Sequence, residues 1–353
     1  MTAPELLASL ERFRSTGPEF GGFLANHGPM AVEALTHVGG TDAIEGWVDR
    51  YLPHLDLPPV MGRGVDHGSW PDRLGDERFL GDWTGFFLEQ TTEMPWKELV
   101  LIWWPRLLEG MAASATHGMI RTAHAVRSLR SAGADADPLL YDELARGLAL
   151  WAARYDPVPG LDAHRPRLDA VAALAALPRL DPDVPARGAG INGRLRALDE
   201  LPGLPLQLGE WRQPSGTDVA LSDLINAAAR VVAARPDAPI PFCHAVTAPA
   251  AVRLVLPVLP HGLARRTVQV SWRVIGALVS AFGDPRDPAE SDAHTMTDAD
   301  RHALLDRLPA AAVEHGDEHV VKLTEAALRE HRISGDDTLL VAADRFRDRM
   351  PQD

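Results

Sequence analysis

Apolar residues recur at helical spacing along almost the whole 353-residue chain, and this periodicity limits the possible fold more than any other feature. The alternating runs typical of half-buried strands are lacking, and the one Asn-Gly pair, Asn192-Gly193, has no strand-like flanks. Helix-start signals occur at Thr41-Asp42 and Ser222-Asp223. The sequence therefore predicts an all-α protein, a multi-helix bundle of antiparallel helix pairs with long Pro/Gly-rich loops.

The segments with helical spacing are bounded by polar or Pro/Gly-rich stretches. They are residues 4–13, 29–38, 41–52, 77–91, 96–109, 111–129, 138–154, 167–176, 222–234, 242–259, 266–282, 297–313, 318–331 and 337–349. Residues 52–75 are predicted to be an irregular loop, and residues 155–216 are rich in Pro and Gly. The second stretch either joins two helical lobes or packs over one core. We expect one all-α domain over residues 1–353, with two lobes joined through residues 155–216 as the alternative.

The composition narrows the classes of function. A hydrophobic content of 46% with 24% charged residues is globular. The formal net charge of −14 argues against nucleic acid or an anionic membrane as the main partner. The single cysteine, Cys243, excludes a disulfide framework and a thiolate-rich zinc site. The first residues lack the pattern of a secretory signal, and every long apolar run is interrupted by proline or charge, so a cytoplasmic protein is expected.

A glycine pattern in RGAGINGR resembles a dinucleotide-binding fingerprint. Gly188, Gly190 and Gly193 satisfy G-x-G-x-x-G, but that function needs a buried strand before the first glycine. The preceding LPRLDPDVPAR holds prolines that a central strand does not tolerate. The sequence favours a flexible loop here, and it contains neither a P-loop nor a G-x-S-x-G motif.

Four of the 14 histidines occur in contexts that could be functional. His27 directly precedes a predicted helix that has Pro29 in its first turn. His117 is expected in the middle of a helix, and His244 in the first turn of one, where the helix dipole favours neutral imidazole. His319 belongs to the segment 318–331. A lone helical histidine is more often a surface or hydrogen-bonded core residue than a ligand, and no H-E-x-x-H motif is present.

The predictions for Arg121, His124 and Lys322 depend on helical geometry. Arg121 and His124 share one side of their helix with His117, a side that is either solvated or lines a polar cavity. Lys322 is one of only two lysines among 35 Lys and Arg residues. Its periodicity groups it with Glu318 and other charged residues, which predicts a solvated helix position and an ion pair with Glu318.

The motifs FLANHGPMAVEAL, THGMIR, FCHAVT and GDEHVVKLTEAALRE, in this order between residues 23 and 330, resemble those of the questin oxidase-like family. The resemblance implies oxidation of a polycyclic aromatic polyketide such as an anthraquinone, with insertion of oxygen from O2 followed by ring opening. Some members of that family are described as NADPH-dependent Baeyer–Villiger enzymes, and others as non-haem iron oxygenases. The lack of a flavin or dinucleotide motif fits a metal better, and imidazole ligands suit Fe(II).

Matched position by position, the family's histidines fall on His27, His117, His244 and His319, and its motif lysine falls on Lys322. A common non-haem iron site has two histidines and one carboxylate. No carboxylate clearly completes the set here, although Glu33, Asp317 and Glu318 are near in sequence. An ammonium group cannot bind a metal, whereas a neutral lysine or its carbamate could. The resemblance thus leads to the hypothesis that Lys322, as a carbamate, is an Fe(II) ligand.

The remaining roles are weaker expectations. Arg121 and His124 could bind a phenolate of the substrate or an oxygen intermediate, and are the predicted catalytic residues. Flat apolar surface for a fused-ring substrate, or ordinary core packing, is offered by Trp83, Phe86, Phe87, Trp103 and Trp104. Two other functions stay open, a flavin-free NADPH-dependent Baeyer–Villiger monooxygenase and a non-catalytic protein that binds an aromatic metabolite.

Overall fold

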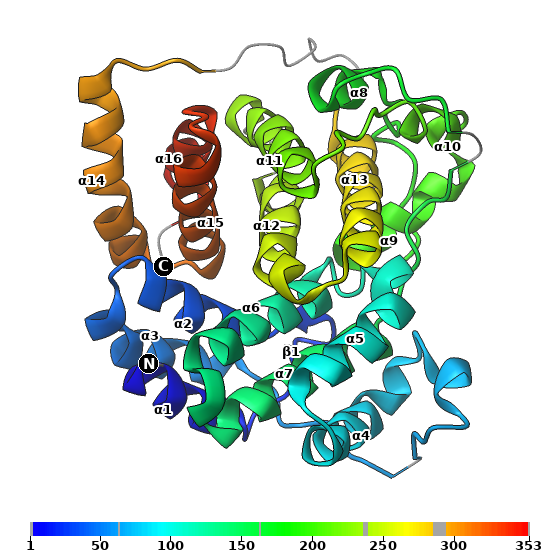
Figure 1. Cartoon of the computed structure of the whole chain (residues 1–353), viewed down its shortest axis with the longest axis vertical. Coiled ribbons are helices and arrows are strands. Elements are labelled where there is room, and N and C mark those ends of the chain that lie inside the picture. Colours follow the sequence, from blue (N-terminus) through cyan, green and yellow to red (C-terminus); the bar gives the residue numbers. More distant parts are fainter. Residues whose placement is uncertain (1–2, 63, 162–163, 236–238, 285–293, 352–353) are drawn as a thin grey trace. The chain divides into compact units, whose positions relative to one another are not determined.

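The computed structural model describes the chain except for residues 1–2, 63, 162–163, 236–238, 285–293 and 352–353 (Figure 1). Within the described residues it is 70% helical, with 16 α-helices and one two-stranded sheet. In that sheet β1 (Glu19–Phe20) pairs antiparallel with β2 (Leu24–Ala25). The prediction of an all-α fold is confirmed.

The chain divides into two compact units. Unit 1 consists of Met1–Pro157 and Leu254–Leu263, and unit 2 of Val158–Arg253 and Ala264–Asp353. The backbone therefore passes from one unit to the other three times. The first of these passages, after Pro157, falls near the start of the Pro/Gly-rich segment 155–216.

Unit 1 is built on helices that pack along one another (Figure 1). They are α1 (Pro4–Phe13), α2 (Gly28–His37), α3 (Ile44–Tyr51), α4 (Leu80–Glu93), α5 (Trp96–Leu107), α6 (His117–Ala132) and α7 (Pro138–Ala153). Helix α7 packs against both α4 and α6. A Cβ added to Gly118 would lie 2.5 Å from the Cα of Trp151, so only glycine lets α6 approach α7 this closely.

The aromatic side chains of α4 and α5 form part of the core of unit 1. Trp83, Phe86, Phe87 and Trp103 contact one another edge-to-face or stacked, with ring centroids 4.8–5.8 Å apart. Each of them is at most 5% exposed. Because these rings cover one another's faces, core packing is the role that the structure supports for them.

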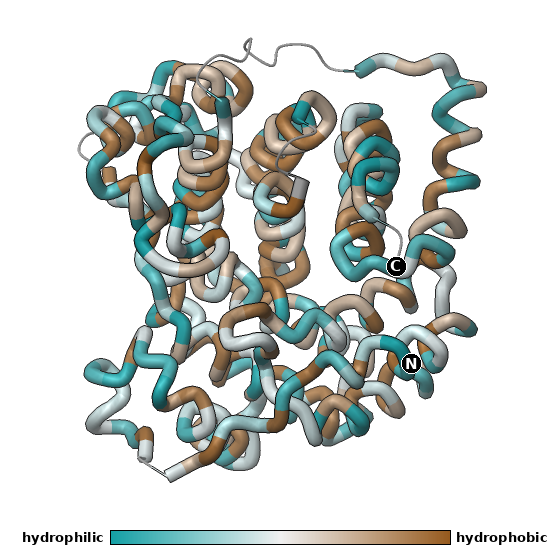
Figure 2. The backbone as a smooth tube through the Cα atoms, turned by 180° about the vertical axis from the view of Figure 1, so that it is seen from behind, coloured by the Kyte–Doolittle hydropathy of each residue, from teal (hydrophilic) through white to brown (hydrophobic). Residues whose placement is uncertain are grey.

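Unit 2 holds the remaining helices. They are α8 (Ala170–Ala176), α9 (Gly190–Leu195), α10 (Leu204–Leu208), α11 (Thr217–Ala234), α12 (Pro239–Val255), α13 (His261–Phe282), α14 (Asp298–His315), α15 (Glu318–Ser334) and α16 (Thr338–Arg349), with the last residues of α12 and the first of α13 counted in unit 1. Helices α11, α15 and α16 pack together, and α14 packs on α15 and α16 (Figure 1). The backbone tube carries apolar and polar residues in alternating patches along these helices (Figure 2), as expected for helices with one buried side.

Buried ion pairs fix the helices of unit 2. Arg253 of α12 donates from Nε to Glu330 of α15 over 2.7 Å, and Glu330 is 1% exposed. Asp337 accepts a hydrogen bond from Nε of Arg301 on α14 at 2.6 Å and lies 3.2 Å from Nε2 of His331 on α15. These contacts set the positions of α12 and α15, which carry the candidate residues of this unit.

Several predicted boundaries are corrected. Residues 111–116 are not part of an α-helix, because α6 begins only at His117. The segment Gly190–Leu195 is a short helix, so the prediction of a loop through RGAGINGR is wrong there, although no strand precedes it among the described residues. Helix α11 begins at Thr217, before the predicted residue 222, and α1 has the predicted bounds.

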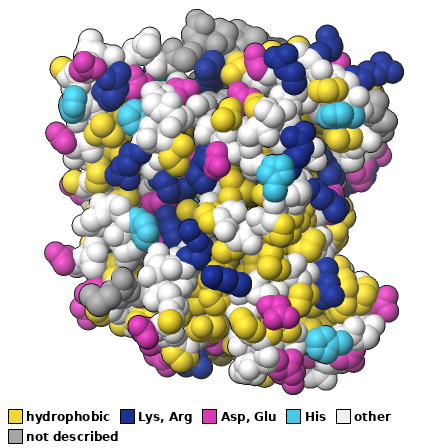
Figure 3. All heavy atoms as spheres, in the orientation of Figure 1, with side chains coloured by type: hydrophobic (Ala, Val, Ile, Leu, Met, Phe, Trp, Pro, Cys, Tyr) yellow, Lys and Arg dark blue, Asp and Glu magenta, His cyan; other side chains and the backbone are white. Residues whose placement is uncertain are grey.

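One described window, Ile240–Val258, is long and apolar enough to cross a membrane by length and composition. Of that window 72% is buried inside the protein, as is usual for a core helix. On the face drawn in Figure 3, acidic, basic and apolar side chains all occur, so this face carries charges of both signs.

Candidate metal-binding histidines

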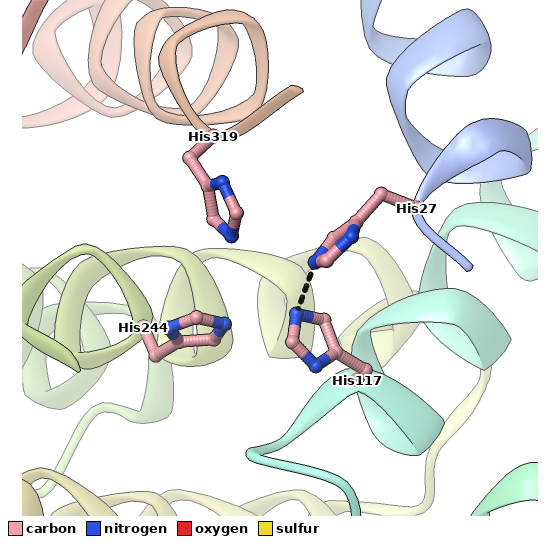
Figure 4. A group of neighbouring side chains, drawn as sticks. All are labelled: His27, His117, His244 and His319. Carbon is pink, nitrogen blue, oxygen red and sulfur yellow. Dashed lines mark hydrogen bonds between the residues drawn. The ribbon is translucent and has the colours of Figure 1, made fainter. Parts of the chain in front are cut away.

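The first histidine pair lies in unit 1, at the starts of two helices. His27 directly precedes α2, as predicted, and His117 is the first residue of α6. Their Nε2 atoms are 2.7 Å apart and their rings are nearly perpendicular, at 89° (Figure 4). Each side chain is about 5% exposed. The two imidazoles thus share one buried hydrogen bond.

The backbone before His117 has an unusual conformation. Ser114, Ala115 and Thr116 have φ of 48°, 53° and 76°, a left-handed run without glycine. This run turns the carbonyl of Ser114 toward His117, where it accepts from the backbone N–H at 3.0 Å and from Nδ1 at 2.5 Å. The prediction that His117 lies in mid-helix is wrong, because the left-handed run prevents the helix from starting earlier.

This contact fixes the tautomer of both histidines in the pair. A carbonyl oxygen only accepts, so Nδ1 of His117 carries a proton, and in the neutral imidazole its Nε2 then keeps a lone pair. Nε2 of His27 must then donate the hydrogen bond between the rings. The fixed Nδ1–H leaves Nε2 of His117 as the ligand atom that a metal would use.

The second pair lies in unit 2, on α12 and α15. The rings of His244 and His319 are 5.7 Å apart between centroids, and their candidate ligand atoms lie within 4.8 Å of each other (Figure 4). They are 1% and 7% exposed. Nδ1–H of His244 donates to the carbonyl of Ile240 at 2.7 Å, which again leaves Nε2 with its lone pair.

His244 is neutral for a different reason from the one predicted. Helix α12 begins at Pro239, so His244 lies in the second turn and not in the first. Burial lowers the pKa of His244 well below its usual value, and His319 and Lys322 lower it further. Desolvation, rather than the helix dipole, therefore keeps this imidazole in the form that binds metal.

Two carboxylates accompany His319 at the start of α15. Asp317 caps the helix by accepting from the backbone N–H of His319 at 2.8 Å and of Val320 at 3.0 Å. Nδ1 of His319 lies 3.6 Å from Asp317 and 3.7 Å from Glu318. Asp317, Glu318 and His319 could by themselves hold a metal ion. These acids, which the sequence could not assign, are thus neighbours of His319.

Lys322 lies one turn after His319 and is 3% exposed, so the solvated position predicted from periodicity is wrong. Burial lowers its pKa to about 8, against the opposing effect of Cys243, Glu318 and Asp317. The same burial raises the pKa of the Cys243 thiol to about 12, which makes Cys243 a neutral core residue. Lys322 and Cys243 are close enough to perturb each other, so Lys322 belongs to the buried region of His244 and His319.

The predicted catalytic residues lie in a buried polar network of unit 1. Arg121 donates two hydrogen bonds to Glu143 of α7, at 2.6 and 2.7 Å. Nδ1 of His124 is 2.7 Å from Glu33 of α2, and Arg127 donates to the same carboxylate. Both Arg121 and His124 lie on α6, one and two turns beyond His117.

A small cavity adjoins this network. Glu33, His124, Ser128 and Glu143 are among the residues around a space of about 10 Å³, enough for one water molecule. This side of α6 is buried rather than solvated, and of its residues His124 and Ser128 line the cavity. The contacts of His124 with Glu33 and of Arg121 with Glu143 could not be foreseen, since these acids come from α2 and α7.

The arrangement suits a divalent metal chemically. The four buried histidines occur as two pairs, one in each unit, and each pair offers imidazoles that could bind a metal ion. Neutral imidazole is a good ligand for iron, zinc, copper and nickel.

Comparison with known proteins gives the family. No match was found among curated proteins. The model of the questin oxidase-like family matches residues 25–327, which include both histidine pairs and Lys322. By this match over most of its length, the chain belongs to the questin oxidase-like family.

Proposed function

We propose that this protein is an Fe(II)-dependent oxygenase that acts on a polycyclic aromatic polyketide such as an anthraquinone and cleaves a ring. Membership of the family suggests an oxygenase with aromatic polyketides as substrates. The observation that supports a metal is a pair of hydrogen bonds to backbone carbonyls. Nδ1 of His117 donates to Ser114, and Nδ1 of His244 donates to Ile240. Holding the proton at Nδ1 while Nε2 stays available is the usual way in which proteins prepare a histidine ligand.

The proposed ligand set is His27, His117, His244 and His319, serving one metal ion. Each pair offers two imidazoles, whereas protein sites for first-row metals ordinarily use three or more protein ligands. The family match includes all four positions. Two pairs that act together would supply four imidazole ligands, whereas either pair supplies only two.

Lys322 is proposed as a further ligand in its carbamate form. Its burial and a pKa of about 8 make the neutral amine, which reacts with CO2, accessible near neutral pH. A carbamate would supply the anionic oxygen that the histidines lack. Arginine could not take this role, because the guanidinium stays protonated.

Bound Fe(II) would supply the one-electron centre that the reaction of O2 with a closed-shell aromatic molecule requires. The residues of the chain position the ligands and set the protonation states of their imidazole rings. The carbonyls of Ser114 and Ile240 keep protons at Nδ1 of His117 and His244, and burial keeps water from their Nε2 atoms. His27 must release its Nε2 proton to become a ligand through that atom.

Metal analysis of the purified protein tests the ligand set. We expect one iron per wild-type chain, and loss of that iron in both double variants, His27→Ala/His117→Ala and His244→Ala/His319→Ala. The matched control is His54→Ala/His302→Ala, which removes two exposed histidines and should retain the iron.

The other outcomes decide between functions. Half-loading or full loading of either double variant would contradict a single shared ion. A metal-free wild-type protein that still binds an anthraquinone would favour the metabolite-binding function. Oxidation of NADPH by iron-free protein, coupled to substrate oxidation, would favour the Baeyer–Villiger function.

Lys322 is tested by crystallography. An anomalous-difference map at the iron edge should place the metal within bonding distance of the modified Lys322. A separation of more than about 5 Å, over twice a normal ligand bond, would rule out this ligand.

A further inference from the structure

Glu33 is a buried carboxylate that joins the two helices carrying the first histidine pair. It is 2% exposed and projects from α2 toward α6. His124 and Arg127 of α6 both contact it, Nδ1 of His124 at 2.7 Å and Nε of Arg127 at 2.6 Å, and a second Arg127 nitrogen also donates to it. Glu33 thus forms ion-pair contacts from α2 with two side chains of α6.

We propose that Glu33 is a positioning residue that sets the register of α2 against α6 and thereby holds His27 against His117. The proposal gives a role to Glu33, which the sequence left unassigned. It rests on the proposed function only for the importance of the histidine pair.

The register follows from the helix geometry. His27 and His117 are at the starts of their helices, and Glu33 and His124 follow them by six and seven residues. At about 1.5 Å per residue these spacings are about 9 and 10.5 Å. The two helices therefore run in the same direction, and the Glu33–His124 contact lies at a similar distance from the histidine pair along each of them. A slip at the Glu33 contact would therefore separate the two Nε2 atoms, which lie 2.7 Å apart.

The charges make this contact strong. Burial alone would favour the neutral acid, but Arg127 and His124 overcome that effect and lower the pKa of Glu33 to about 2. The carboxylate is therefore ionised under all ordinary conditions. Because both of its oxygens already accept from Arg127 or His124, Glu33 acts through the helices rather than as a metal ligand.

The chain supplies a matched control. Arg121 and Glu143 form a second buried bidentate pair on α6, with side chains 3% and 9% exposed. This pair joins α6 to α7 and leaves α2 untouched. Glu33→Gln and Glu143→Gln each remove one buried negative charge beside an α6 arginine, but only the first loosens α2.

The test uses the metal-free full-length chain labelled with ¹⁵N, so its outcome does not depend on activity. In the wild type we expect a slowly exchanging, downfield Nε2–H signal from His27, donated to His117. Glu33→Gln should lose that signal and weaken binding of Zn²⁺, used as an air-stable probe, at least tenfold. Glu143→Gln should keep the signal and bind Zn²⁺ within about threefold of the wild type.

Each result has a definite meaning. An unchanged His27 signal in folded Glu33→Gln, or equal loss of the signal in both variants, would overturn the proposal. If Glu33→Gln does not fold, Arg127→Lys repeats the comparison while keeping the charge, with Arg130→Lys, at an exposed position of α6, as its control. A wild-type chain that shows the signal but binds no Zn²⁺ would count against the proposed function alone.

Discussion

The left-handed turn at Ser114–Thr116 stores free energy next to a candidate ligand. Non-glycine residues in this conformation each cost about 1–3 kcal/mol. Ala115→Gly should relieve one such cost and, after the greater entropy of unfolded glycine, raise the free energy of unfolding by about 1 kcal/mol. Because a glycine restricts the backbone of the turn less, His117 should be held less firmly, and the affinity of the protein for metal should fall. Urea unfolding of the metal-free protein and a Zn²⁺ titration measure the two effects.

The control for this substitution is Ala175→Gly, at an exposed position in α8, which should lower the free energy of unfolding by about 1 kcal/mol. Loss of stability in Ala115→Gly, of the same sign as in the control, would show that the turn is not strained.

The buried ammonium of Lys322 should destabilise the metal-free protein. Its folded pKa, about 8, is below the usual value of 10.5, so the unfolded chain binds more protons between these values and stability rises with pH there. Lys322→Met removes the effect and should stabilise the protein at pH 7 by as much as about 3 kcal/mol. The difference between the two proteins should shrink toward pH 10.5.

Urea unfolding of both proteins at pH 7 and 10 checks this prediction. Lys97→Met, at an exposed lysine, should show no such pH-dependent difference. An equal effect of the two substitutions would mean that Lys322 is hydrated.

At the scale of helices, Asp337 connects α14, α15 and α16. The hydrogen bonds from Arg301 are the main cause that lowers its pKa to about 2, with a further contribution from His331. A lowered carboxyl pKa stabilises the fold above the unfolded value of 3.8 and loses that contribution as the pH falls toward 2. Asp337→Asn should therefore be less stable than the wild type by about 1–2 kcal/mol at pH 6, with a smaller difference at pH 2.5.

Circular dichroism during urea unfolding at the two pH values tests this prediction. Asp298→Asn is the matched control, because Asp298 also pairs with Arg301 but its side chain is 87% exposed. A pH-independent difference for Asp337→Asn would contradict the linkage.

The helices also show what a sequence can predict. Periodicity found most of the long helices, because one buried side repeats every 3.6 residues. It missed the late start of α6, which depends on backbone strain at Ser114–Thr116 and not on hydropathy. It also placed Lys322 in solvent, because a helical wheel orders the residues of one helix and carries no information on what covers it. The assignment of the four histidines as metal ligands came from the family resemblance. The carbonyl groups that accept from His117 and His244 could be identified only from the structure.

For the whole molecule, metal binding should raise stability by linkage. An ion at 100 times its dissociation constant adds about 2.7 kcal/mol to the free energy of unfolding. We expect thermal unfolding of the iron-loaded protein to shift downward by several degrees after chelation, and no shift in His27→Ala/His117→Ala. Differential scanning calorimetry under anaerobic conditions measures this shift. A chelator effect that persists in the double variant would indicate another metal site.

The path of the backbone between the two units bears on synthesis by the ribosome. Met1–Pro157 emerges first, but unit 1 also requires Leu254–Leu263, whose Leu254 carbonyl accepts a hydrogen bond from Arg130. All of Val158–Arg253 must be translated in between, which takes roughly 5–20 s at typical elongation rates. The nascent chain therefore spends that interval with its first unit incomplete, and the order of folding is set by chain topology as well as by stability.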